Sequence, residues 1–290
     1  MQPQFLAIGH VVQDLTSDED PSAWRLGGAA SFASLLAHNL GLRTAVLTSA
    51  AADLPLTKLL KDIDCRVIYS KQTTQIRNVY GEGGRRQTVP QRATPITLEH
   101  LRSDWRQTPV VLLGPVMGEV DEALAAAFPG SLIGVGAQGN LRRVGRDHRV
   151  RQVQPADWDA RRVLRHTRAL FLSDEDIPRG EAPPALAFWS DQVEIVAFTR
   201  GDGGAEVSHR GRWRHIAAFP AAKVVDPTGA GDVFAAAFLI RLRESGDIWK
   251  ATRFAACAAS FVVEGVGVKN IPTRAQIDAR LDANQQIFAR

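Results

Sequence analysis

The sequence predicts an α/β protein with a central, mostly parallel sheet flanked by helices and a small β lid. Short apolar runs of strand length alternate with segments of helical periodicity over most of the chain. Strand and helix in alternation indicate a parallel sheet whose faces are covered by helices. A group of short β segments within residues 66–96 interrupts this alternation, and we expect it to form the lid.

The first part of the chain contains two strand and helix pairs. Residues 5–12, FLAIGHVV, form an apolar run that is typical of a buried strand. A diglycine at 27–28 precedes apolar residues at helical spacing, and Gly41 is a suitable helix end. Residues 44–50 then indicate a second strand and residues 55–64 a second helix.

The segment that breaks the alternation contains three short strands around a glycine-rich turn. The strands are expected at 65–70, 73–84 and 85–96, with the turn at 81–84. Together with residues from about 11–25, the residues 66–96 are expected to form the lid.

The alternation resumes after residue 109. The expected strands are 110–114, 131–136, 169–173 and 193–199, and the expected helices are 121–128, 156–167, 183–191 and two that start near Gly231 and Lys250. A hairpin is expected at 204–219. No internal repeat or low-complexity linker divides the chain, so residues 1–290 are interpreted as one domain.

Composition excludes several classes of protein. With 45% apolar and 23% charged residues, the chain is an ordinary globular protein rather than a disordered or fibrous one. No apolar run reaches the length of a membrane span, and the start MQPQFLAIGH lacks the features of a signal peptide. We therefore expect a cytoplasmic protein without a membrane partner. Cys65 and Cys257 are expected to be buried thiols.

Positive charge is concentrated in one part of the chain. Nine arginines and two histidines lie between Arg142 and Arg168, although the net charge is only +4. No aromatic-interleaved pattern and no zinc-finger spacing accompany these residues, so we expect a solvated surface and no nucleic-acid partner. Binding of an anionic substrate or a nucleotide phosphate is a second use for such a surface.

The segment 224–246 carries the clearest sign of chemistry. Gly229, Ala230 and Gly231 allow backbone amides to approach an anion at a helix start, where the helix dipole also favours negative charge. Asp232 follows in the first helical turn. A carboxylate beside an anion site is what phosphoryl transfer to an alcohol requires, namely a base and donors that absorb charge. A glycine-rich turn whose aspartate only caps the helix is the alternative.

The thirteen residues DPTGAGDVFAAAF closely resemble the second signature of the PfkB family, the ribokinase-like carbohydrate kinases. The resemblance implies a ribokinase-like fold and an ATP-dependent kinase that uses Mg²⁺. It also implies that Asp232 is the base and that Gly229, Ala230 and Gly231 form the anion hole. A polyol, sugar or nucleoside would be the acceptor.

Other segments extend the resemblance along almost the whole chain. It implies that Asp14, Gly27, Gly28 and Ser31 bind the acceptor, although without it Asp14 would be an ordinary loop residue. The segment AACAASFVVEGVGV resembles the part that walls the adenine. By the same resemblance the nucleotide is contacted by Thr199, Gly201, Gly204, Thr228, Gly229 and Gly231. A hairpin turn explains the glycines at 201 and 204 equally well.

Two departures from the family pattern affect the substrate and the metal. Phe32 stands where most sugar kinases of the family carry Asn, and GGAASF is similar to the myo-inositol kinase branch, so a cyclitol is the expected acceptor. The family's NxxE motif would fall at 173–176, which reads SDED; Asp176, or Glu175 in its place, is expected to serve Mg²⁺ through water. By resemblance, Asp226 and Thr228 lie where many relatives bind a monovalent cation such as K⁺.

Alternatives to this interpretation remain. Residues 134–139, GVGAQG, fit a dinucleotide-binding pattern, but the residues that follow lack an apolar helical face. An oxidoreductase is therefore a minor alternative. A non-catalytic sugar or nucleotide sensor is another, because the magnesium motif is altered. The chain is expected to be a monomer or a homodimer joined through the lid.

Overall fold

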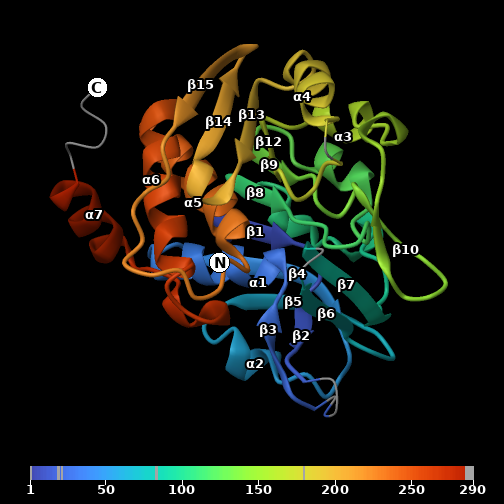
Figure 1. The fold of residues 1–290 in the computed structure, drawn as a ribbon. Coiled ribbons are helices and arrows are strands. Elements are labelled where there is room, and N and C mark those ends of the chain that lie inside the picture. The colour runs from blue at the N-terminus through green and yellow to red at the C-terminus, as the bar shows by residue number, and fades with distance from the viewer. Residues whose placement is uncertain (1, 18–19, 21, 82–83, 179, 285–290) are drawn as a thin grey trace.

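The computed structural model describes residues 2–17, 20, 22–81, 84–178 and 180–284. These residues form a central sheet between two layers of helices, with a smaller sheet beside it (Figure 1). The predicted fold class, a mostly parallel sheet flanked by helices, is confirmed.

The central sheet has nine strands in the order β15-β14-β13-β12-β9-β8-β1-β4-β5. From β13 to β5 every neighbouring pair is parallel, and β14 and β15 add an antiparallel edge. The strands are β1 (Phe5–Ile8), β4 (Thr44–Ala50), β5 (Asp64–Tyr69), β8 (Val110–Leu113), β9 (Leu132–Gly136), β12 (Ala169–Ser173), β13 (Ile195–Thr199), β14 (Ala205–His209) and β15 (Arg212–Ile216).

Helices cover both faces of this sheet. One face carries α1 (Ala29–Asn39), α5 (Ala230–Ser245) and α6 (Ile248–Val262), with α7 (Arg274–Ala283) outside α6 (Figure 1). The opposite face carries α3 (Arg161–Leu164) and α4 (Ala182–Ser190), and the short helix α2 (Leu56–Leu59) follows β4. Because side chains of a strand alternate between faces, Phe5 and Ala7 enter one core while Leu6 and Ile8 enter the other.

The small sheet has the order β3-β2-β6-β7. Its strands are β2 (Val12–Leu15), β3 (Trp24–Gly27), β6 (Thr74–Gly81) and β7 (Gly84–Gln91). A hairpin of β10 (Arg142–Val144) and β11 (Val150–Gln152) lies beside β7, where the Val89 amide donates to the carbonyl of His148 at 2.8 Å. Two parts of the chain that are distant in sequence therefore meet at this edge.

Several expected elements differ in the structure. The run 5–12 is divided between β1 and β2, which lie in different sheets, and residues 65–70 belong to β5 of the central sheet rather than to the insertion. The helices expected at 55–64 and 156–167 contain only the four-residue helices α2 and α3, and residues 122–127 form a 3₁₀ helix. The turn expected at 81–84 contains residues 82–83, which lie outside the described residues.

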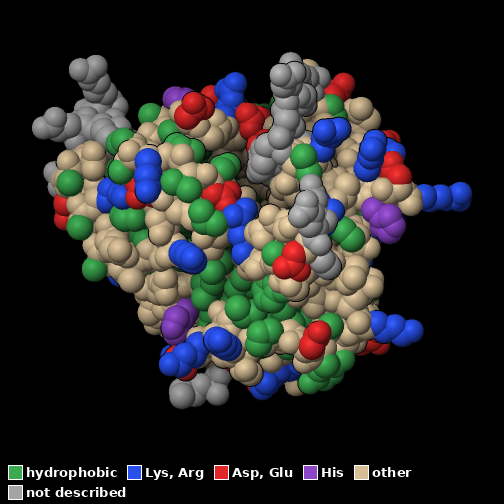
Figure 2. All heavy atoms as spheres, turned by 60° about the horizontal axis from the view of Figure 1, so that its bottom comes forward, with side chains coloured by type: hydrophobic (Ala, Val, Ile, Leu, Met, Phe, Trp, Pro, Cys, Tyr) green, Lys and Arg blue, Asp and Glu red, His purple; other side chains and the backbone are tan. Residues whose placement is uncertain are grey.

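The surface carries charges of both signs. Figure 2 shows the molecule from the side of the small sheet, where basic and acidic side chains are interspersed and hydrophobic side chains form a band across the lower part. None of the helices in the described part of the chain combines the length and the apolar character that a membrane span requires. Cys65 is partly buried and Cys257 is buried, and both are free thiols.

We expect the replacement Phe238→Ala to destabilise the fold. Phe238 is fully buried on α5, where its ring packs edge-on against Phe171 of β12 at a centroid distance of 5.5 Å. Loss of this ring should lower the free energy of unfolding by about 3–5 kcal/mol. Urea unfolding measures the effect, with Phe188→Ala on the exposed surface of α4 as control. Equal losses in the two variants would contradict this account of the core.

Candidate active site

A large cleft separates the small sheet from the end of the central sheet where the parallel strands finish. Its lining includes Ser173 and Thr199, which end β12 and β13, and Gly231 at the start of α5. This edge of a parallel sheet is the usual ligand site in open α/β folds. The cleft volume is about 1770 Å³, whereas one ligand typically occupies ~300–1,000 Å³. The cleft therefore has room for two small molecules side by side.

The floor of the cleft is the start of α5, and its backbone geometry depends on a glycine. Gly229 has a φ of 84°, a left-handed conformation that side chains disfavour. A Cβ atom there would lie 2.2 Å from the ring of Phe32, which is buried on α1. The Phe32 ring thus packs against the turn that was predicted to bind an anion.

This turn leaves three backbone amides available for an anion. The Val233 amide donates to the Gly229 carbonyl at 3.0 Å, and the Ala230 amide donates to the Pro227 carbonyl at 3.2 Å. The amides of Gly229, Gly231 and Asp232 have no hydrogen-bond partner within the described part of the chain, as is usual at the start of a helix. Of the residues expected to form the anion hole, Gly229 and Gly231 therefore keep available amides, whereas the Ala230 amide is engaged, and Asp232 adds one more amide.

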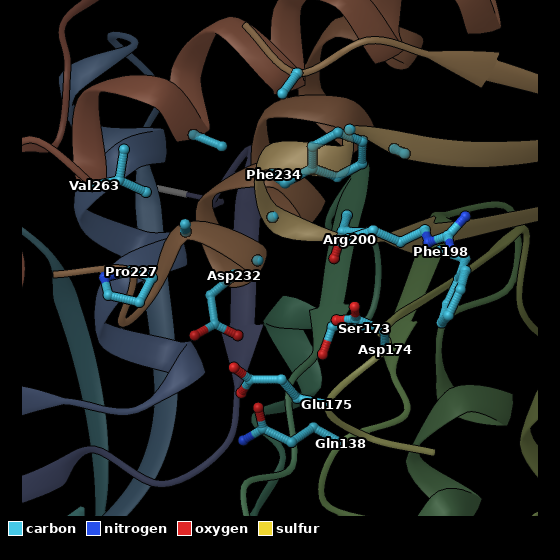
Figure 3. Close-up of a pocket in the computed structure, with 18 of the residues that line it drawn as sticks. Gln138, Ser173, Asp174, Glu175, Phe198, Arg200, Pro227, Asp232, Phe234 and Val263 are labelled. Atoms are coloured by element: carbon cyan, nitrogen blue, oxygen red, sulfur yellow. The ribbon is translucent and has the colours of Figure 1, made fainter. Parts of the chain in front are cut away.

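Asp232 points from the first turn of α5 into the cleft, toward Glu175 (Figure 3). Burial, together with the neighbouring carboxylates of Asp176 and Asp14, raises the pKa of Asp232 to about 7, whereas Arg142 opposes the shift. A carboxylate with a pKa near 7 can accept a proton at neutral pH and release it again, as a general base must.

Asp176 is held away from the cleft by a buried ion pair. One of its oxygens lies 2.9 Å from Nη2 of Arg142, and both side chains are only 4% exposed. The other oxygen accepts hydrogen bonds from the amide and the hydroxyl of Ser173, both at 2.9 Å. Because both oxygens are engaged, Asp176 does not fit the role expected of it toward Mg²⁺.

Glu175 is the acidic residue of this turn that fits a magnesium role. It is exposed, lines the cleft and lies near Asp232 (Figure 3). The described residues contain no cluster of three or more potential metal ligands. Mg²⁺ that arrives on donor phosphates keeps several waters and needs only one or two carboxylates, so Glu175 is compatible with it.

The acceptor side of the cleft is built around Asp14 of β2. Its carboxylate is buried at the cleft wall, and a Cβ atom at Gly27 would lie only 2.2 Å from it. Gly28 lines the cleft as expected, with a φ of 88°. Ser31 does not line the cleft, because it is fully buried and its hydroxyl donates to the Gly27 carbonyl at 2.8 Å. Asp14 and Gly28 thus face the cleft, whereas Gly27 and Ser31 support them from behind.

Sequence reasoning missed the amides on this side. Asn78 of β6 and Gln87 of β7 line the cleft and are joined by a hydrogen bond of 2.7 Å from Nε2 of Gln87 to Oδ1 of Asn78. Gln138, which follows β9, adds a third amide. Nothing in the sequence marks these three residues, because the pairing of β6 with β7 decides which side chains face the cleft.

The donor side contains the residues expected for a nucleotide. Thr199, Gly201, Gly204 and Thr228 all line the cleft, together with Gly229, Ala230 and Gly231. A Cβ atom at Gly204 would lie 2.2 Å from the carbonyl oxygen of Ile216, so the hairpin approaches closely there. The far end is walled by Ala256, Ala259 and Val263, from α6 and the residue that follows it. This wall fits a flat apolar group such as a base.

Asp226, which precedes the turn at 227–229, is already matched by a positive charge. Its Oδ2 lies 3.0 Å from Nη2 of Arg25, and its Oδ1 accepts the Thr228 amide at 3.0 Å. Asp226 is nine-tenths buried and is not part of the cleft lining. The monovalent cation expected at Asp226 and Thr228 therefore does not fit the residues present.

Sequence reasoning also missed the burial of Arg142. This residue belongs to the arginine-rich stretch that was expected to be a solvated surface, yet it is buried. The dinucleotide pattern at 134–139 is followed by the β10–β11 hairpin instead of a helix. A dinucleotide phosphate would therefore find no helix start at that position.

Comparison with known proteins agrees with this geometry. Residues 166–274 match the family model described as pfkB family carbohydrate kinase. The Nucleoside kinase of Methanocaldococcus jannaschii is 32% identical over 128 residues, which are 42% of this chain and 42% of that relative. The aligned part thus spans less than half the length of the curated relative.

Solved structures match nearly the whole chain. One of them is a pyrophosphate-dependent myo-inositol-1 kinase that was converted into a myo-inositol-3 kinase. Its TM-score is 0.78 and its sequence identity is 21%, and the match covers 97% of this chain and 99% of that chain. The Ribokinase of Arabidopsis thaliana complexed with ribose and ATP has a TM-score of 0.69 and 19% identity, with the same coverage. At such identities these matches establish the fold.

The family match includes Asp232 and the turn before it, and the fold match extends to the small sheet that carries Asp14. Residues 166–274 are therefore similar to pfkB family carbohydrate kinases, and the chain as a whole has the fold of ribokinase-like proteins.

Proposed function

We propose that the chain is a kinase that transfers the γ-phosphoryl group of ATP to a hydroxyl of a small polyol. One observation carries the proposal: Asp232, with a pKa raised to about 7, lies in the first turn of α5 beside backbone amides without a hydrogen-bond partner among the described residues, at the lining of a cleft with room for two ligands. A base and an anion site at one place are what this reaction needs.

The roles of the residues follow from their positions. Asp14 and the amides of Asn78 and Gln87 would hold acceptor hydroxyls, and Asp232 would remove the proton of the reacting hydroxyl. The oxygen–phosphorus bond to the acceptor then forms while the bond between the γ-phosphorus and the β,γ-bridging oxygen breaks, and ADP leaves. The amides of Gly231 and Asp232 would stabilise charge on the transferred group. Mg²⁺, which Glu175 would hold through water, would offset the charge of the donor phosphates.

The acceptor that we favour is myo-inositol or a related cyclitol. A wall of one carboxylate and several amides suits a ligand that presents hydroxyls around a ring. The myo-inositol kinase among the fold neighbours supports the same class. Ribose and nucleosides are the alternative acceptors, since a ribokinase and a nucleoside kinase are also relatives.

Inorganic pyrophosphate is a second candidate for the donor. The apolar wall at Ala256, Ala259 and Val263 favours ATP, because pyrophosphate has no base to place there. The pyrophosphate dependence of the myo-inositol kinase neighbour favours the other donor. Assays of acceptor phosphorylation with each donor at equal Mg²⁺ concentration separate the two.

We expect Asp232→Asn to lower kcat by about 10²–10⁴-fold, the usual effect of removing a positioned base. A coupled ADP-release assay over a panel of polyols, sugars and nucleosides measures it. Nucleotide affinity should change little, because Asn keeps the backbone amides in place. Unchanged turnover in the variant would remove Asp232 from the proposed role. Binding of an acceptor without ATP consumption by the unmodified protein would instead indicate a sensor.

The pH dependence offers an independent check on the base. Asp232 must be ionised to accept a proton, and its pKa is raised from 3.8 to about 7. As the pH falls through 7, kcat/KM for the acceptor should therefore decline about tenfold per pH unit. The decline would begin near pH 4 for an unshifted aspartate, and such a profile would contradict the assignment.

The small sheet is proposed to act as a lid over the acceptor. Its strands β6 and β7 carry Asn78 and Gln87 to the cleft wall, so a bound acceptor should restrain them. We expect amide hydrogen exchange within residues 70–95 to slow when the acceptor is added, while exchange in α7, which is remote from the cleft lining, stays constant. Equal slowing of both regions would point to a general stabilisation instead. Whether two lids pair in a homodimer stays a prediction.

A further inference from the structure

The ion pair of Arg25 and Asp226 joins the small sheet to the turn that begins α5. Arg25 lies on β3 and Asp226 lies in the loop before that turn, so the pair links the first and last parts of the chain. In the register of the small sheet, Arg25 lies directly opposite Asp14, the acceptor carboxylate of β2. One arginine thus connects the strand pair that holds the acceptor with the loop that holds the phosphate.

Asp226 has one hydrogen-bonded oxygen and one that is buried without a hydrogen bond from the described residues and faces only the Arg25 cation. Oδ1 accepts the amide of Thr228 at 3.0 Å and so fixes the bend of the loop, while Oδ2 faces the Arg25 guanidinium at 3.0 Å as an ion pair. The backbone amides of Val225 and Asp226 donate to the carbonyl of Val263 and anchor the loop on α6. The carboxylate therefore has a defined place and a defined cationic partner.

The surroundings distinguish this pair from a typical surface salt bridge. The Asp226 side chain is only 11% exposed and that of Arg25 is 32% exposed. The aliphatic part of Arg25 passes close to Gly267, since a Cβ atom added at Gly267 would lie 3.5 Å from Cδ of Arg25. A buried carboxylate without a cation would be unstable, so some positive charge is required at Oδ2. A metal ion at the same oxygen would be repelled by the guanidinium.

We propose that Arg25 supplies from within the chain the positive charge that holds the Asp226 loop under the start of α5, so that no monovalent cation is needed there. Arg25 is a positioning residue: it does not line the cleft, and it acts on the Gly231 and Asp232 amides through the loop. The catalytic part of the proposal rests on the proposed kinase function.

The first experiment compares K⁺ with choline at constant ionic strength in the unmodified protein. Kinase activity and the thermal midpoint should be the same in both salts, within about twofold for the rate. Activation by K⁺ of tenfold or more, or a K⁺-specific rise of the thermal midpoint, would overturn the proposal. The thermal measurement needs no substrate, so it tests the cation claim even if the kinase assay finds no acceptor and the proposed function fails.

The second experiment makes the site dependent on an added cation. Arg25→Met should lose at least tenfold of the activity in choline and regain several-fold in K⁺, with a thermal midpoint that rises with K⁺ concentration. Arg25→Lys should keep activity in choline, and Arg66→Met, at an exposed arginine of β5, is the matched control. In the double variant Arg25→Met, Asp226→Asn the response to K⁺ should vanish. An Arg25→Met protein that is fully active in choline would overturn the proposal; if it fails to fold, the comparison of salts in the unmodified protein decides.

Discussion

The left-handed turn at Gly229 is the constraint on which the rest of this site depends. Its conformation, together with the Phe32 ring that fills the space of a side chain, ends the loop and begins α5 at one defined point. Gly231 and Asp232 then both line the cleft, and the Asp232 carboxylate points into it (Figure 3). An anion site that consists of backbone cannot move independently of the helix, so α1, α5 and the central sheet together hold it in place.

Charge around the cleft is arranged by two arginines that come from the small sheet and from the β10–β11 hairpin. Arg25 forms an ion pair with Asp226 and Arg142 forms one with Asp176, so each guanidinium offsets the charge of one buried carboxylate. Asp232 instead lines the cleft without a cationic partner of this kind in the described part of the chain, and burial, followed by the nearby carboxylates of Asp176 and Asp14, raises its pKa. The same arrangement separates carboxylates with a structural role from the one that is suited to proton transfer.

Much of the fold could be predicted because its strands are short apolar runs. The expected strands at 44–50, 110–114 and 169–173 correspond to β4, β8 and β12. Helical periodicity was less reliable: the segments 55–64 and 156–167, expected as helices, contain α2 and α3 of only four residues each. The β10–β11 hairpin was missed because its arginines suggested a solvated surface, although Arg142 is buried there.

The sequence by itself determined the local chemistry of the site: a glycine-rich turn, a helix start and an acidic residue lie within a few consecutive positions, where backbone geometry dictates their relation. Only the tertiary structure decided which charges meet. Arg25 reaches Asp226, Arg142 reaches Asp176, and Gln87 reaches Asn78 through strand register and packing between segments. Such contacts depend on which side chains a strand turns toward the cleft and which groups burial forces to pair, and neither property is encoded in local spacing.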